Sequence, residues 1–202
     1  MCALLNRLNV PYDCGLFYTR HPEVHHAVCG PGSDAPAYLA TSSSSSSSTS
    51  AIPSPLNTRL ENSSRFRGLP LYASLVSYGV AGYSSIVRRN IDFARRLEGW
   101  LRSSSDYDVL TPDPAKTSFR VLNIVLFAPS KTCPRTEWTD HDSGGSKMTE
   151  EINRSGEMYV TATKWMGRSA ARLAVSNHLT VLHGEKDFEI VTGRLRTVMG
   201  RQ

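Results

Sequence analysis

The chain has 202 residues, of which 40% are hydrophobic and 20% charged, and its formal net charge is +5 at pH 7. This length and balance are typical of a globular protein with a hydrophobic core, and they exclude a wholly disordered chain. The 23 basic and 18 acidic residues are interleaved without a block of lysines, which argues against a nucleic-acid partner.

Cysteine spacing and hydropathy exclude further classes. The four cysteines are widely spaced and form no C-x-x-C pair, so neither a disulfide framework nor a zinc site is suggested. No apolar run approaches the ~18 residues that a membrane span needs, and the N-terminus lacks a signal-peptide pattern. We therefore expect a cytoplasmic protein without a membrane partner.

The N-terminal segment has little regular patterning. Leu8–Tyr18 is apolar and partly aromatic, but a proline and a glycine interrupt it, which favours short strands and loops. His21, His25 and His26 follow in a polar stretch. Adjacent histidines in a strand point to opposite faces, and no cysteine or carboxylate has suitable spacing, so we expect no metal site there.

A tract of low complexity follows. Thr41–Ser50 is almost pure serine, and Ile52–Leu56 contains two prolines. Such a segment cannot bury enough apolar surface to offset the entropy lost on ordering. We predict a mobile linker at residues 41–56, between an N-terminal part at residues 1–40 and a C-terminal domain at residues 57–202.

The most regular pattern follows this linker. Leu69–Tyr78 is predicted to be one helix, and the glycines of residues 79–82 break it before a second helix that runs to about Arg102. Apolar residues of the second helix recur at three- and four-residue spacings, and its paired arginines fall elsewhere. This pattern indicates a helix with one buried face and one solvent-exposed face.

Strands alternate with helices in the remainder of the chain. Four segments rich in β-formers are predicted strands: Tyr107–Leu110, Phe119–Phe127, Met158–Thr163 and Ala170–Ser176. We expect an irregular insertion at residues 129–147, a short helix at Met148–Ser155 and a final helix at Asp187–Met199. The order predicts an α/β protein, α+β in the covered part, with helices on one face of a mainly antiparallel sheet.

Several segments resemble, in the same order, the group II pyridoxal-phosphate-dependent amino-acid decarboxylases, the lineage of aromatic-amino-acid, tyrosine and glutamate decarboxylases. These segments are Asn9–Gly15 (NVPYDCG), Ser64–Tyr72 (SRFRGLPLY), Tyr78–Tyr83 (YGVAGY), Asn123–Phe127 (NIVLF) and Ala171–Asn177 (ARLAVSN). The second and third resemble the family's R-R-F-x-x-L and Y-G-x-x-G-y stretches. The resemblance covers only the C-terminal portion of such an enzyme.

The resemblance implies a fold, a cofactor and a reaction. The fold is the C-terminal small domain of a fold-type I pyridoxal-phosphate-dependent enzyme, and residues 1–40 are the end of its large domain. The reaction is that of a lyase: the decarboxylation of an amino acid, with pyridoxal phosphate as the electron sink. Relatives of this kind are homodimers, which makes a second copy or a full-length subunit the expected protein partner.

The residue that would hold the cofactor is not in its place. In the family a His-Lys pair precedes the stretch that Asn9–Gly15 resembles, and an alignment without a gap puts Leu5 and Asn6 at that pair. An amide nitrogen is not nucleophilic, so Asn6 cannot bind pyridoxal phosphate covalently. Either the lysine position has changed in a pseudoenzyme, or Met1–Arg7 is unrelated sequence from a misjudged gene start. The abrupt start of the resemblance favours the second.

Under both interpretations of Met1–Arg7 the chain lacks most of the large domain. The resemblance therefore implies that the isolated chain is inactive and contains no catalytic residue. The alternative from another class is a non-catalytic truncated paralogue that docks on a full-length decarboxylase subunit. A basic nucleic-acid-binding module is a third, weaker alternative. In each case the apolar helix at Leu69–Tyr78, if left uncovered, is expected to make the isolated chain self-associate.

Arginines are the candidate site residues that the resemblance implies. In glutamate-decarboxylase relatives an arginine at the place of Arg172 pairs with a substrate carboxylate, for which its planar guanidinium is suited. The alternative for Arg172 is a surface salt bridge. Arg65 and Arg67 lie in the segment that resembles R-R-F, where Ser64 replaces the first arginine. Arg65 is expected near the cofactor, or else both arginines cap or salt-bridge the following helix.

Overall fold

The computed structural model describes residues 14, 16, 18–29, 64–182 and 185–201. The predicted linker at residues 41–56 and the position of Asn6 lie outside these residues. Most of the N-terminal part at residues 1–40 lies outside them as well.

A short helix, α2, replaces the strands and loops that we predicted around the N-terminal histidines. It spans Pro22–Cys29. Proline suits the first turn of a helix because its missing N–H would find no partner there, and Glu23 complements the helix dipole. The Nδ1 atom of His21 lies 3.0 Å from a carboxylate oxygen of Glu23. The prediction was wrong because this start signal outweighed the preceding apolar pattern.

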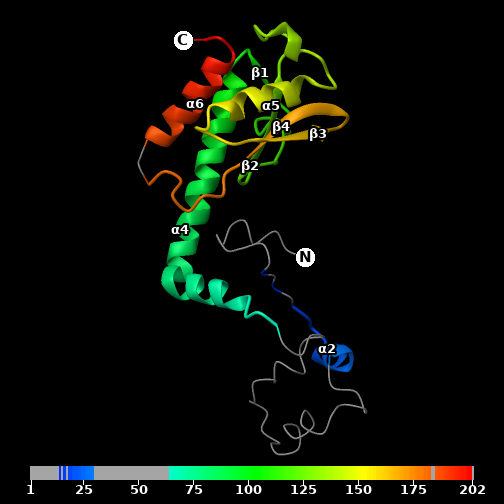
Figure 1. Ribbon diagram of the computed structural model, residues 1–202, viewed down its shortest axis with the longest axis vertical. Helices are drawn as coiled ribbons and strands as arrows, with labels where there is room; N and C mark the ends of the chain where they lie inside the picture. Colours follow the sequence, from blue (N-terminus) through cyan, green and yellow to red (C-terminus); the bar gives the residue numbers. More distant parts are fainter. Residues whose placement is uncertain (1–13, 15, 17, 30–63, 183–184, 202) are drawn as a thin grey trace, which may run out of the picture.

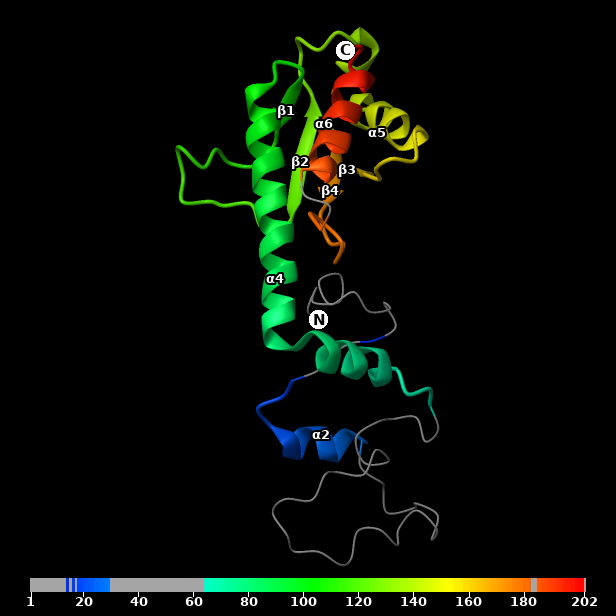
Figure 2. The same cartoon turned by 90° about the vertical axis from the view of Figure 1, so that its left-hand side faces the viewer.

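The longest element, α4, spans Gly68–Ser103 and contains the predicted break. Gly79 has φ 57° and ψ −174° inside it, a conformation that is open to glycine and strained for other residues. The chain therefore bends between residues 68–78, here termed the apolar arm, and the rest of the helix. Figures 1 and 2 show the arm projecting away from the sheet.

The sheet is four-stranded and antiparallel throughout, as the sequence predicted, with the order β1-β2-β4-β3. Its strands are β1 (Tyr107–Val109), β2 (Ile124–Pro129), β3 (Thr161–Trp165) and β4 (Arg168–Ala174). The predicted strand at Phe119–Phe127 begins late. Residues before Ile124 form a loop instead, in which the guanidinium of Arg120 donates hydrogen bonds to the carbonyls of Pro114 and Thr117.

The segment at residues 129–147 is more regular than we predicted. It contains a 3-10 helix at Thr136–Trp138, and helix α5 (Gly144–Arg154) begins inside it. The two glycines that start α5 allow a close approach: a Cβ on Gly144 would lie 1.8 Å from the carbonyl oxygen of Trp138, and one on Gly145 would lie 2.4 Å from a backbone atom of β4. Glycine is read as a loop signal from sequence, whereas here tight packing requires it.

Three helices cover one face of the sheet, which confirms the predicted layers. Helix α5 contacts β2, β3 and β4, while α4 contacts β1 and β2, and α6 (Lys186–Val198) packs on α4 and α5 (Figures 1 and 2). The fully buried core between these layers includes Leu97, Leu101, Val125, Phe127, Met148, Ile152, Ala171 and Leu195. Among the described helices, none combines the length and apolarity needed to cross a membrane.

Candidate functional site

Strand β4 presents two chemically different faces. Ala171 and Leu173 are buried in the core beneath the helices. Because successive side chains of a strand point to opposite faces, Arg172 between them lies on the face away from the helices. Its partners across the sheet are Leu126 of β2 and Thr161 of β3, both half-buried. We term this surface the open face of the sheet.

The guanidinium of Arg172 is uncommitted within the described part of the chain. It is half-buried and makes no side-chain hydrogen bond or ion pair with a described residue. Arg168 on the same strand differs, because it donates to Asp108 at 2.8 Å and to the carbonyl of Pro129 at 2.6 Å. The salt-bridge alternative for Arg172 therefore has no partner among the described residues, and its donors remain available.

Arg65 and Arg67 lie elsewhere in the molecule. They precede α4 and are both exposed, and the main-chain N–H of Arg67 donates to the carbonyl of Arg65 at 2.8 Å. This segment lies at the far end of the apolar arm from the sheet (Figure 1). The described residues therefore do not bring Arg65 to Arg172.

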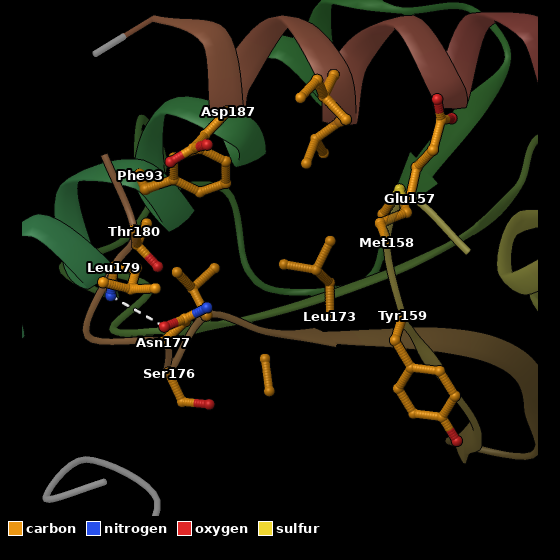
Figure 3. A pocket seen from close by; sticks show the side chains of 14 residues that line it. Phe93, Glu157, Met158, Tyr159, Leu173, Ser176, Asn177, Leu179, Thr180 and Asp187 are labelled. Carbon is orange, nitrogen blue, oxygen red and sulfur yellow. Dashed lines mark hydrogen bonds between the residues drawn. The ribbon is translucent and has the colours of Figure 1, made fainter. Parts of the chain in front are cut away.

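A cavity of about 530 Å³ lies on the other side of β4, the side that the helices cover. Leu173 of β4 and Phe93 of α4 line it (Figure 3), and its lining also includes Val175 and, from α6, Ile190 and Val191. Among the described residues, its lining includes two acidic side chains and no Lys, Arg or His. Since Leu173 and Arg172 point to opposite faces, the cavity and Arg172 are separate sites.

The described residues do not fit pyridoxal phosphate. That cofactor needs a lysine amine in a pocket and donors for its phosphate. All five lysines of the chain are exposed: Lys116, Lys131, Lys147, Lys164 and Lys186. No described residue that lines the cavity beside Leu173 is basic. We therefore derive no catalytic step from these residues.

A second cavity, of about 300 Å³, lies between the C-terminal ends of α4 and α6, and its carboxylate and its phenol are already paired. Arg201 donates to buried Asp106 at 2.8 Å. The hydroxyl of Tyr107 donates to the carbonyl of Leu195 at 2.7 Å, and burial raises the pKa of this phenol well above its usual range. These pairs stabilise the helix ends and leave no activated nucleophile there.

Cys133, which belongs to the core cluster between the helices and the sheet, is also not activated. Its thiol donates to the carbonyl of Arg135 at 3.2 Å, and burial is the main cause of its raised pKa. A reactive cysteine needs the opposite shift. The described cysteines Cys14, Cys29 and Cys133 form no disulfide.

Loops are bound by three of the α4 arginines, a role that sequence reasoning missed. Arg102 donates to the carbonyls of Thr111 and Pro112 at 2.9 and 3.1 Å. Arg89 lies outside the buried stripe, as predicted, yet it donates to the carbonyls of His178 and Thr180 at 3.1 and 3.2 Å. Arg95 likewise donates to the carbonyl of Val121 at 3.0 Å. Because main-chain carbonyls have no residue-specific signature, no local pattern could have identified these partners.

Curated relatives of the chain are plant decarboxylases. Tryptophan decarboxylase 1 of Oryza sativa subsp. japonica is 27% identical over 171 residues, which cover 85% of this chain and 31% of the relative. Tryptophan decarboxylase 2 of the same plant is 30% identical over 141 residues, covering 68% and 26%. Aromatic-L-amino-acid decarboxylase of Catharanthus roseus is 28% identical over 127 residues, covering 63% and 23%. The chain thus spans less than a third of each relative, and no family model matches it.

Solved structures share its architecture. Catharanthus roseus tryptophan decarboxylase in complex with L-tryptophan superimposes with a TM-score of 0.54 at 26% identity, over 71% of this chain and 28% of that one. Oryza sativa TDC with PLP and tryptamine gives a TM-score of 0.55 at 24% identity, over 73% and 29%. Mouse CSAD gives 0.54 at 13% identity, over 77% and 32%. The rice and mouse structures are less than 25% identical to this chain, so their similarity shows the fold alone.

Proposed function

We propose, from the homology of this chain to the group II pyridoxal-phosphate-dependent amino-acid decarboxylases, that it is the C-terminal small domain of a carboxy-lyase that decarboxylates an amino acid. The observation that carries this proposal is the agreement between a sequence similarity and a structural similarity. One plant enzyme type, tryptophan decarboxylase, matches the chain in sequence and also in the arrangement of its helices and sheet.

In this proposal the complete enzyme uses pyridoxal phosphate, which the solved rice relative contains. The cofactor supplies an electron sink for the carbanion that remains when carbon dioxide leaves. We propose that these 202 residues do not catalyse the reaction by themselves. The exposed lysines, and the absence of basic groups among the described residues that line the cavity beside Leu173, support this part of the proposal.

Arg172 is the residue that we propose for substrate binding. A guanidinium that is half-buried and has no partner among the described residues carries part of the cost of desolvation without a compensating contact. A substrate carboxylate would supply that contact as a bidentate pair. Arg65 remains a secondary proposal, for a place near the cofactor, because the described residues do not connect it to Arg172.

The apolar arm supports a partner in the complete enzyme. Its exposed side chains include Leu69, Tyr72, Leu75 and Val76, which are 52%, 65%, 45% and 67% exposed. Contiguous apolar surface of this kind marks an interface. We propose that a second subunit or another domain covers it in a homodimeric, cytoplasmic enzyme.

A chimera tests the domain assignment. Residues 64–202 would replace the homologous stretch of rice tryptophan decarboxylase, and release of carbon dioxide would be measured in the presence of pyridoxal phosphate. We expect a folded, active chimera and an inactive isolated chain. A folded chimera without activity would contradict the proposal, and binding of the isolated chain to the intact rice enzyme would then favour a docking protein.

The same chimera tests Arg172. Replacing it by Gln is expected to lower kcat/KM by roughly tenfold to a hundredfold, because a charge-assisted bidentate pair contributes about 1.5–3 kcal/mol. Arg172→Lys should recover part of the loss. The matched control is Arg154→Gln, since Arg154 is an exposed arginine that pairs only with Glu151 of its own helix. Equal effects of the two Gln variants would remove Arg172 from the site.

A further inference from the structure

The cavity beside Leu173 has the size and the walls of a small-molecule site. Its volume of about 530 Å³ lies within the range of roughly 300–1,000 Å³ that ligand pockets occupy. Apolar side chains from separate elements meet in it: Phe93 from α4, Met158 from the segment before β3, and Ile190 from α6 (Figure 3). An occupant with an apolar body would release the water that these walls now contact.

The charged groups among the described lining residues have one sign. These are Glu157 and Asp187, and Figure 3 shows them at opposite ends of the cavity. Neither carboxylate forms an ion pair with a described residue. The guanidinium of Arg89 donates to the carbonyl of the lining residue Thr180 at 3.2 Å, but Arg89 is not among the described lining residues. The lining therefore favours a cation and disfavours an anion.

The rim of the cavity is held in place before any ligand binds. The side chain of Asn177 accepts a hydrogen bond from the N–H of Leu179 at 2.9 Å, and that of Asp187 accepts one from the N–H of Val181 at 2.8 Å. Arg89 secures the same loop from α4. A ligand therefore does not have to order residues 177–181, which lowers the entropic cost of binding.

We propose that this cavity binds a small organic cation that carries an ammonium group on an apolar, ring-sized body. The walls contact the body, the carboxylate of Asp187 attracts the ammonium group at one end of the cavity, and Glu157 adds negative charge at the other end. This site goes beyond the proposed function, because it lies on the opposite side of β4 from Arg172. The two proposals can therefore fail independently.

Three probes of one shape test the charge preference. 1-Naphthylmethylamine, 1-naphthalenemethanol and 1-naphthoate share their ring system and differ in charge, and naphthalene fluorescence reports binding to the full chain at neutral pH. We expect the amine to bind about threefold to tenfold more tightly than the alcohol, since one partly exposed ion pair contributes little more than that, and the carboxylate to bind most weakly. An alcohol that binds as tightly as the amine would overturn the proposal.

Variants locate the bound amine. Asp187→Asn keeps the acceptor for the Val181 N–H but removes the charge, and Ile190→Trp fills the cavity from its rim, where Ile190 is 38% exposed. Both are expected to weaken amine binding at least threefold, while Glu189→Gln, an exposed position of α6 outside the lining, should leave it unchanged. The proposal fails if Glu189→Gln weakens binding as much as Asp187→Asn. It fails equally if Arg172→Gln changes amine binding, because the amine would then lie on the open face.

Discussion

The two parts of α4 share a helical backbone and differ in what covers them. C-terminal to Gly79, a continuous stripe is buried against the sheet and α6: Ile86, Asn90, Phe93, Ala94, Leu97, Glu98 and Leu101. In the apolar arm only Leu71 is buried, although the arm contains no charged residue. An apolar pattern therefore predicts that a helix needs a covering surface, but the pattern does not say whether the same chain supplies it.

Truncating a leucine in each part should give the largest contrast. Leu97→Ala removes a fully buried side chain and is expected to lower the free energy of unfolding by about 3 kcal/mol, whereas Leu75→Ala in the arm should cost well under 1 kcal/mol. Urea titration followed by circular dichroism measures both. Equal losses would mean that the arm is packed against other residues of the chain in solution.

Polar substitutions in the arm should reduce self-association. A chain with Leu69→Ser, Tyr72→Ser and Val76→Ser is expected to self-associate at least about tenfold more weakly, because burying each apolar side chain contributes on the order of 1.5 kcal/mol. Sedimentation equilibrium at several concentrations measures the change. The control, Ser84→Ala with Asp92→Asn, alters exposed positions beyond the bend. A parent chain that remains monomeric at high concentration would contradict the prediction.

Two glycines of α4 should respond to alanine with opposite signs. Gly79→Ala places a Cβ at φ 57° and should cost about 1–2 kcal/mol, either as strain or through loss of the edge-to-face contact between Tyr78 and Tyr83, whose centroids are 5.6 Å apart. Gly99→Ala meets no atom within 4 Å and should stabilise the helix by up to about 1 kcal/mol. Thermal unfolding of both variants tests this; the bend at Gly79 is unimportant if both are stabilised.

Acid should lower the stability of the folded chain only slightly through the ion pair that Glu185 forms with α4. The hydrogen bond from Arg96 lowers the pKa of Glu185 below its ordinary value of 4.5. Because the folded-state pKa is the lower one, this pair contributes stability above the ordinary value and loses it as the pH falls through the folded-state pKa. We expect Glu185→Gln to have a slightly smaller fall in Tm than the parent chain between about pH 6 and about pH 3. An identical fall in both chains would show that the pair contributes nothing.

Part of the fold followed from local patterns. The bend at Gly79, the antiparallel strands at Tyr107 and Ala170, and the final helix were all predicted, because periodicity and turn residues act over a few positions. The start of α5 was missed. Residues 129–147 were predicted to be irregular, whereas the close approach of Gly145 to β4 depends on residues more than twenty positions away.

The two candidate sites differ in the same way: one was predicted from a local segment of the sequence, and the other was not. Arg172 was identified from the segment that surrounds it, and the structure added that no described residue pairs with it. The cavity beside Leu173 had no signal in the sequence, since its walls come from residues between Phe93 and Val191. From the sequence, Asp187 was only part of a predicted helix start. The structure shows that it lines the cavity together with apolar side chains.

Helices, strands and the family resemblance could be predicted because backbone propensity, side-chain periodicity and short motifs are properties of neighbouring residues. Long-range contact alone decided which apolar stripe is covered, which arginine binds a loop and where acidic groups meet an apolar wall. Arg89 and the carbonyls of His178 and Thr180 illustrate the reason: about ninety residues separate them, and any residue offers such a carbonyl.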